Sequence, residues 1–214
     1  MNTSNMNPIQ RELMDIILKA GCVTTQQVKE VLERFFDFKG ENIVYRLLGI
    51  LQSRGAIQWI NDRSIVVSGA HQFDSTCGLS RVSIENFRIC LTYAKTKEDI
   101  KCILHGDGYF EKTFFADSHC YKIVHLSSQS LYKATAAQQA FNEEYSKHNR
   151  HLKSDLSNEW SYTTIFAISP GENIDYILDG IAYLELTMPH LFFCFTNTDA
   201  AMDFEYDIYG ETMS

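Results

Sequence analysis

Residues 39–68, KGENIVYRLLGILQSRGAIQWINDRSIVVS, decide the fold of the first half of the chain. Apolar residues recur at three- and four-residue spacing from Ile43 to Leu51, which predicts an amphipathic helix. Gly55 follows where a helix commonly ends. Alternating apolar residues then predict two short strands, joined by the turn Asn61-Asp62-Arg63.

Two shorter amphipathic helices are expected before this segment. Pro8 suits the first turn of one of them, and Thr24 or Thr25 is a suitable N-cap for the other. Three helices followed by a hairpin are the outline of a winged helix-turn-helix domain, so residues 1–70 are predicted to form one.

Composition narrows the class of protein. The 214 residues are 45% hydrophobic and 21% charged, as in ordinary globular proteins. The sequence has no apolar run of the roughly 20 residues that cross a membrane, and its first ten residues have no signal-peptide core. Its six cysteines form no Cys-x-x-Cys pair and are expected to be reduced. These features predict a cytoplasmic protein without a membrane partner.

Charge is divided unevenly along the chain. The net charge is −8, but residues 1–70 hold eight Lys/Arg and seven Asp/Glu, whereas residues 71–214 hold eleven and twenty. The first half is therefore free to present a positive face to nucleic acid, although the whole chain is acidic.

The predicted third helix would enter the major groove, with the hairpin as the wing. Asn42 offers two hydrogen bonds that fit an adenine edge, and Arg46 offers two that fit a guanine edge. Tyr45 shares their side of the helix. The expected contacts to the DNA backbone, and the residue at the tip of the wing, are Lys39, Arg54, Arg63 and Asn61. Glu41 would repel phosphate, and winged helices also bind proteins, so a protein partner stays an alternative.

The second half is predicted to be a separate domain. Residues 71–81 are polar and small and indicate a linker. Helices and strands then alternate through residues 82–214, which predicts a small acidic α/β domain, with the apolar segment 191–196 as a central strand. The expected fold class of the whole chain is α+β.

Five segments occur in an order that resembles a known arrangement. They are Thr24-Thr25-Gln26-Gln27-Val28 and residues 39–68, 112–128, 163–168 and 191–196. On them the chain resembles a two-domain family from Gram-positive bacteria and their mobile elements. It is more distantly similar to replication-relaxation proteins, which join a winged helix to a degenerate nuclease-like domain. The resemblance implies a role in plasmid or mobile-element replication or transfer.

A nuclease of this type needs an Asp on one strand and an acid-x-Lys on the next, to hold Mg²⁺ and orient water. The second strand has Cys120-Tyr121-Lys122, without the acid, and Asp99-Ile100-Lys101 lies in a predicted helix. Histidines and cysteines near residues 102–125 have no zinc spacing, and His148 and His151 are expected to be solvated. The sequence therefore predicts neither a metal nor another cofactor, and no enzyme.

These observations predict a DNA-binding accessory or regulatory protein that acts on double-stranded DNA through the N-terminal winged helix. The acidic domain would form a homodimer or dock a protein partner, such as a relaxase or a replication initiator. Two alternatives stay open. One is a winged helix that binds protein, and the other is a transcriptional regulator whose α/β domain senses a small ligand.

Overall fold

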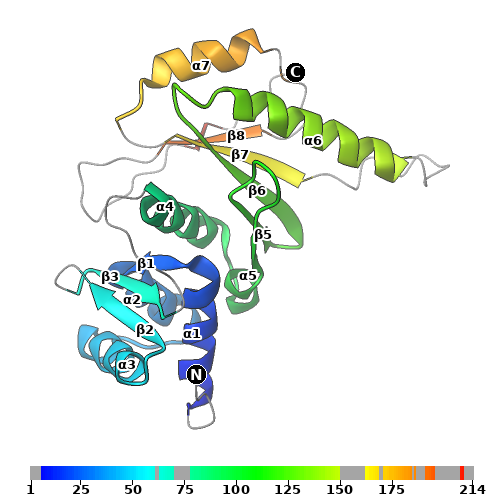
Figure 1. Cartoon of the computed structure of the whole chain (residues 1–214). Coiled ribbons are helices and arrows are strands. Elements are labelled where there is room, and N and C mark those ends of the chain that lie inside the picture. The colour runs from blue at the N-terminus through cyan, green and yellow to red at the C-terminus, as the bar shows by residue number, and fades with distance from the viewer. Residues whose placement is uncertain are drawn as a thin grey trace. The chain divides into compact units, whose positions relative to one another are not determined.

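The structure, a computed structural model, describes residues 6–60, 63–69, 78–149, 162–168, 171–184, 186, 191–195 and 208–209 (Figure 1). The chain divides into two compact units, Met1–Ile103 and Leu104–Ser214. The first contains helices with a small antiparallel sheet, and the second contains helices with a mixed sheet. The fold class is therefore α+β, as the sequence predicted.

Capping side chains set the start of the first two helices. α1 (Pro8–Ala20) begins after Asn7, whose side chain accepts a hydrogen bond from the backbone N–H of Gln10. α2 (Thr25–Phe35) begins after Thr24, which caps the helix in the same way. The side-chain oxygen of each cap satisfies a backbone N–H that has no partner inside the helix. The predicted threonine cap is confirmed.

α3 (Glu41–Ser53) and the hairpin after it have the predicted order. The helix has Arg54 as its C-cap, and Gly55 has a φ of +67°, a conformation that glycine adopts without strain. β2 (Ile57–Ile60) and β3 (Ile65–Ser68) then pair antiparallel. The helix, the glycine stop and the two strands expected from the sequence are therefore confirmed.

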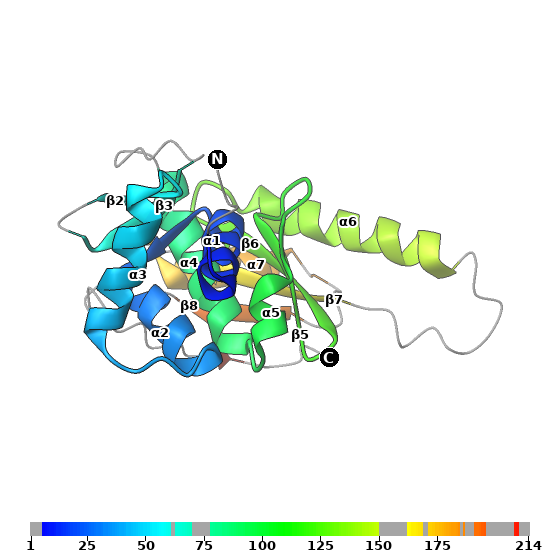
Figure 2. The same ribbon diagram turned by 90° about the horizontal axis from the view of Figure 1, so that it is seen from below.

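A third strand, β1 (Cys22–Thr24), was not expected from the sequence. It pairs antiparallel with β3, so the small sheet has the order β1-β3-β2. α2 and α3 lie side by side, and β2 follows from the end of α3 (Figure 2). The largest fully buried side chains of these elements are Leu13, Ile16, Ile17, Leu32, Leu48, Leu51 and Ile57.

Two further helices, α4 (Gly78–Tyr93) and α5 (Lys97–Lys101), are part of the first unit. The guanidinium of Arg34, near the end of α2, donates hydrogen bonds to the carbonyl oxygens of Leu91 and Ala94 at 2.9 and 2.7 Å. These carbonyls lie at the C-terminal end of α4, where backbone acceptors have no partner inside the helix. Arg34 therefore caps α4 from a neighbouring helix.

The boundary between the compact units differs from the predicted domain boundary. The sequence predicted a linker at 71–81 and a second domain from residue 82 onward. α4 begins at Gly78, inside that linker, and the first unit extends to Ile103, while residues 70–77 lie outside the described part. The physical reason is that α4 is apolar on most sides and has to be buried. Its fully or almost fully buried side chains are Phe87, Ile89, Cys90 and Leu91.

The part of the second unit that the structure describes is built on a sheet of six strands in the order β4-β5-β6-β7-β8-β9. The strands are β4 (Ile103–His105), β5 (Lys112–Ala116), β6 (His119–Leu126), β7 (Tyr162–Ile168), β8 (Leu191–Phe195) and β9 (Ile208–Tyr209). β5 and β6 form an antiparallel hairpin, and β6, β7 and β8 are parallel neighbours. The strand predicted at residues 191–196 is β8, and it is not an edge strand, but it lies between β7 and the two-residue edge strand β9 and not at the centre of the sheet.

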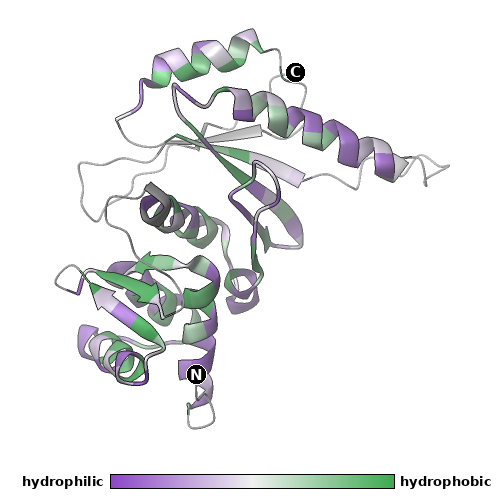
Figure 3. Ribbon diagram, in the orientation of Figure 1, coloured by the Kyte–Doolittle hydropathy of each residue, from purple (hydrophilic) through white to green (hydrophobic). Residues whose placement is uncertain are grey.

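Two helices connect the parallel strands. α6 (Tyr132–Asn149) joins β6 to β7, and α7 (Ile174–Tyr183) joins β7 to β8. Much of the surface of α6 is hydrophilic (Figure 3), whereas its Ala134, Ala137 and Phe141 are buried in the core of the unit. No helix in the described ranges is both long and apolar enough to span a membrane.

Two ion pairs hold α6 to the hairpin strands. Nζ of Lys122 on β6 lies 2.7 Å from Oε1 of Glu144 on α6. Nζ of Lys133 on α6 lies 2.8 Å from Oε1 of Glu111, the residue before β5. Lys122 is also 3.9 Å from the ring centroid of Tyr162, where the aromatic face attracts a cation. The charges of Lys122, Lys133, Glu111 and Glu144 are therefore paired within the unit and help to hold α6 against the hairpin.

Candidate functional site

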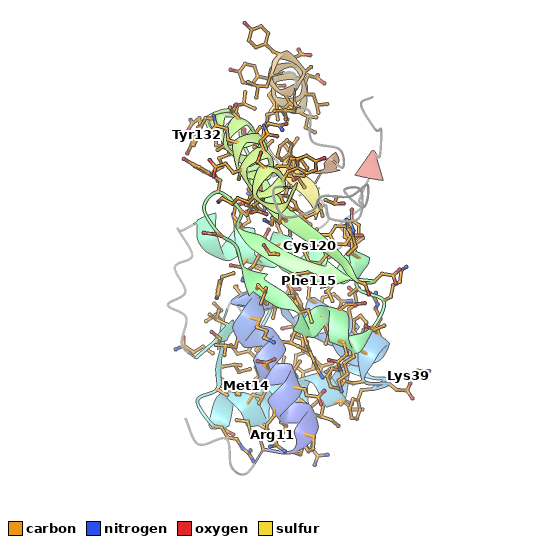
Figure 4. All side chains as sticks on the ribbon, turned by 90° about the vertical axis from the view of Figure 1, so that its right-hand side faces the viewer. Arg11, Met14, Lys39, Phe115, Cys120 and Tyr132 are labelled. Carbon is orange, nitrogen blue, oxygen red and sulfur yellow. The ribbon has the colours of Figure 1, made fainter. Side chains whose placement is uncertain are left out.

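The outward face of α3 presents the polar side chains that the sequence selected. Asn42, Tyr45 and Arg46 are exposed, whereas Val44 is buried on the opposite side of the helix. The colouring of Figure 3 shows the same division of α3 into a hydrophilic and a hydrophobic side. Lys39, just before the helix, is exposed and projects outward (Figure 4). These four polar residues are available to a partner.

An aromatic stack joins this face to the hairpin. The rings of Tyr45 on α3 and Trp59 on β2 are stacked, with centroids 5.5 Å apart and planes inclined by 24°. The guanidinium carbon of Arg63, in the turn between β2 and β3, lies 5.3 Å from the centroid of the Trp59 ring. Helix, strand and turn therefore present one continuous surface of ring and cation.

Hydrogen bonds fix the end of the turn to the start of α2. The indole N–H of Trp59 donates to the carbonyl oxygen of Arg63 at 2.7 Å, and the hydroxyl of Thr25 donates to the same oxygen at 2.5 Å. The backbone N–H of Thr25 donates to the carbonyl of Ser64 at 2.8 Å. Arg63 has a positive φ of 69°, a conformation uncommon for a residue with a side chain. Three contacts around it hold the arginine in place.

The cations of α3 and the hairpin differ from most others of the first unit in having no ion-pair partner among the described residues. Within the described residues, Lys39, Arg46 and Arg63 make no ion pair, so no carboxylate of this part of the chain neutralises them. Most cations on the other helices are paired: Lys19 with Asp15, Lys29 with Glu41, Arg34 and Arg88 with Glu30, Arg81 with Glu85, and Lys97 and Lys101 with Glu12. Arg11 on α1 also makes no ion pair within the described residues, but Arg63 is the unpaired cation that lies over the stack, and Arg46 follows Tyr45 directly in the chain.

Two of the predicted site residues stand apart from this group. Arg54, at the C-cap of α3, has its Nη1 3.5 Å from Oε1 of Gln10 on α1, so its head group is shared with a neighbouring helix. Asn61 lies outside the described residues. Glu41, which was expected to repel phosphate, lies 3.5 Å from Nζ of Lys29 through its carboxylate. Its side chain is 71% exposed, so this ion pair is weak.

Sequence reasoning missed the part that Trp59 plays. The alternation of Ile57, Gln58 and Trp59 predicted only a strand, whereas the half-buried ring of Trp59 lies against Tyr45. An aromatic residue on a short strand, one residue before a polar turn, was the only available signal. It could not show which helix the ring would meet.

In the second unit, Glu111, the carboxylate just before the hairpin, already has partners. Neither β5 nor β6 contains Asp or Glu. Glu111 precedes β5, and its Oε1 pairs with Lys133, while its Oε2 accepts the backbone N–H of His125 at 3.0 Å. Both oxygens of Glu111 thus hold the hairpin and α6 together, and neither is directed to an open ligand position.

The histidines and cysteines whose side chains are possible soft metal ligands have other contacts in the structure. Among the described residues, no three His, Cys, Asp or Glu side chains are grouped closely enough to hold a metal ion. Nε2 of His119 lies 2.7 Å from Oγ1 of Thr163. Burial raises the pKa of Cys120 above its ordinary value and raises that of Cys22 to about 12, so both are thiols at neutral pH. His151 lies outside the described residues.

Comparison with known proteins adds no relative. No protein-family model matches the chain, and no curated protein is similar to it in sequence. The function therefore has to be inferred from the geometry of the two units.

Proposed function

We propose that the chain binds double-stranded DNA through a winged helix-turn-helix formed by its N-terminal elements. α3 would be the recognition helix, and the β2–β3 hairpin would be the wing. The observation that supports this most is the Tyr45–Trp59 stack with the guanidinium of Arg63 over it, next to a helix face on which Arg46 is exposed and makes no ion pair within the described residues. DNA phosphates would supply the negative charge that this part of the chain does not.

The proposed contacts divide into two kinds. Asn42 and Arg46 lie one helical turn apart on the exposed face of α3, so both can reach base edges in one major groove. Lys39 precedes the helix, and Arg63 lies in the wing, so these two are placed at its flanks and contact phosphates. Tyr45, which lies between Asn42 and Arg46 in the sequence of α3, would lie against a sugar or a thymine methyl group.

In this proposal the chain is an accessory or regulatory protein and not an enzyme. The second unit would be a degenerate nuclease-like domain, because its strands lack the metal-binding acids and Glu111 is occupied. Residues 104–214 contain six Lys/Arg and sixteen Asp/Glu, a surface suited to a protein partner or a second copy and unsuited to DNA. In a homodimer each copy would bind one DNA half-site, so both contacts would contribute to the affinity of the dimer for the whole site.

A protein partner for the α3 face is the second candidate. Tyr45 is 43% exposed, and aromatic residues together with arginine are the side chains most enriched at protein interfaces. The first unit holds thirteen Lys/Arg and eleven Asp/Glu, an excess small for a DNA-binding domain. This alternative predicts that the chain binds its protein partner with an affinity that changes little with salt concentration.

The test is the salt dependence of duplex binding by the full chain, measured by fluorescence anisotropy. The proposal predicts that affinity falls steeply with salt, and that Arg46→Ala and Arg63→Ala each weaken binding about tenfold and lower the salt slope by about one. Lys147→Ala is the matched control, because Lys147 is exposed on α6 in the other unit. No salt-dependent binding at micromolar protein would refute the proposal.

A further inference from the structure

A glycine occupies the centre of the outward face of α3. Gly49 lies four residues after Tyr45 and three after Arg46, and three residues before Gln52 and four before Ser53. Positions at these spacings lie on the same side of a helix. All four neighbours are exposed, so they surround the glycine with side chains of the same face.

Nothing in the described structure requires a glycine at this place. Gly49 does not have the positive φ that favours glycine, and a Cβ added there would meet no atom within 4 Å. Other glycines have a visible reason: a Cβ on Gly69 would lie 2.5 Å from the carbonyl oxygen of Gly55, and one on Gly180 would lie 2.7 Å from Leu131. A glycine within a helix that is not needed for packing makes the fold less stable than alanine would, and Gly49 is half-buried with open space beside its Cα.

The missing side chain leaves a gap in the side-chain layer of α3. Tyr45 and Arg46 border it on one side, and Gln52 and Ser53 border it on the other. The helix backbone is therefore accessible to a partner at the middle of the face. Glycine commonly occurs where a ligand or another backbone approaches the chain closely.

We propose that Gly49 is the point at which α3 makes its closest approach to the DNA duplex, with the helix backbone in van der Waals contact with a sugar or base edge. This inference rests on the proposed DNA binding. Arg46 and Asn42 on one side of the gap would then reach base edges, and Gln52 and Ser53 on the other side would meet the opposite flank of the groove.

The test is Gly49→Ala in the full chain, with thermal stability and duplex affinity both measured. Stability should rise and affinity should fall. Alanine is the better helix former, so the midpoint of thermal unfolding should rise by about 4 °C. The added methyl group occupies the contact, so affinity for a duplex should fall about tenfold. Thr92→Ala on α4 is the control, because it improves an exposed helical position far along the chain from α3. It should raise the midpoint without changing affinity.

Each other result overturns the inference. If Gly49→Ala keeps the affinity of the natural chain while Arg46→Ala loses it, DNA binding stands, but the closest approach is elsewhere. If Gly49→Ala lowers the unfolding midpoint, the fold itself needs the glycine, and the argument from an unneeded gap fails. If the natural chain does not bind duplex DNA, the inference falls together with the proposed function.

Discussion

Tyr45 on α3 and Trp59 on β2 stack with their ring centroids 5.5 Å apart, so the exposed helix face and the hairpin are held as one surface. Trp59 also donates its indole N–H to the carbonyl oxygen of Arg63. One side chain thereby sets the position of a tyrosine on the helix and of a cation in the turn. Under the proposed function, Trp59 is a positioning residue and makes no DNA contact of its own.

Two substitutions separate the ring of Trp59 from its N–H. Trp59→Phe keeps a ring beside Tyr45 and loses the indole N–H, which donates to the Arg63 carbonyl and to the Thr25 hydroxyl, while that hydroxyl still reaches the Arg63 carbonyl. We expect it to cost about 1 kcal/mol of unfolding free energy, whereas Trp59→Ala should cost about 3 kcal/mol. Urea unfolding measures both values. Duplex affinity should fall more for Trp59→Ala, and an unchanged affinity for that variant would show that the stack does not position the DNA contacts.

Removing the charge of Glu41 should improve DNA binding. Glu41 lies in the first turn of α3, beside the proposed phosphate contact Lys39, and its ion pair with Lys29 is largely exposed. Glu41→Gln should raise duplex affinity about threefold at low salt, and the gain should shrink as salt screens the charge. It should also lower stability slightly, because a carboxylate favours a helix N-terminus.

Glu98→Gln is the matched control for this change. Glu98 also lies in the first turn of a helix, is 75% exposed and pairs with a lysine, Lys101, but it belongs to α5. Equal effects of the two substitutions on affinity would show that only net charge matters, and would remove the support for a site at α3.

Local signals in the sequence were sufficient to predict where helices and strands lie. They were insufficient to predict which elements pack or pair with one another. Thr24 as a cap and Gly55 as a stop act on their own helices, so residues a few positions away determine them. β1 has only three residues, and its place depends on β3, more than forty residues later in the chain. Three residues contain no period that indicates a strand.

The candidate site shows the same limit. The outward residues of α3 follow from helical periodicity, and Asn42, Tyr45 and Arg46 are exposed as expected. Whether a cation is paired depends on which carboxylate the fold brings near it. No sequence pattern distinguished Arg46, which has no ion pair in the described part, from Arg34, which pairs with Glu30 and caps α4.

The first unit should need α4 and α5 in order to fold. Gln27 on α2 donates to the carbonyl of Ile84 at 2.9 Å, and Glu30 pairs with Arg88, so α2 makes polar contacts along α4. A fragment of residues 1–70 would lose these contacts and expose the surface that α4 covers. We expect residues 1–103 to unfold cooperatively on heating, and residues 1–70 to aggregate or melt without a clear transition. A cooperative transition of the shorter fragment at the same temperature would restore the boundary predicted from the sequence.

The Lys122–Glu144 pair should stabilise the second unit. Lys122 is only 14% exposed in its side chain and contacts the faces of Phe110 and Tyr162 as well as the carboxylate. Lys122→Ala should therefore lower the unfolding free energy by about 2 kcal/mol. Lys147→Ala, on the exposed side of α6, should change it by less than about 0.5 kcal/mol. Equal effects in urea unfolding would mean that the buried lysine has no structural role.

Glu12 should make the stability of the first unit depend on pH in the acid range. A hydrogen bond from Lys97 is the main cause that holds the pKa of Glu12 below its ordinary value, and the charge of Lys101 acts in the same direction. A carboxyl whose pKa is lower in the folded state stabilises that state when it is ionised. This contribution is complete above the unfolded pKa, and it disappears as the pH falls through the lowered folded value.

The measurement is the thermal unfolding midpoint between about pH 6 and pH 3, where this titration takes place. The midpoint of the natural chain should fall more steeply on acidification than that of Glu12→Gln, because the variant has already lost the ionised pair. Glu143→Gln serves as the control, since Glu143 is exposed on α6 and makes no ion pair within the described residues. Its profile should follow that of the natural chain. If all three profiles are parallel, the charge of Glu12 does not link α1 to α5.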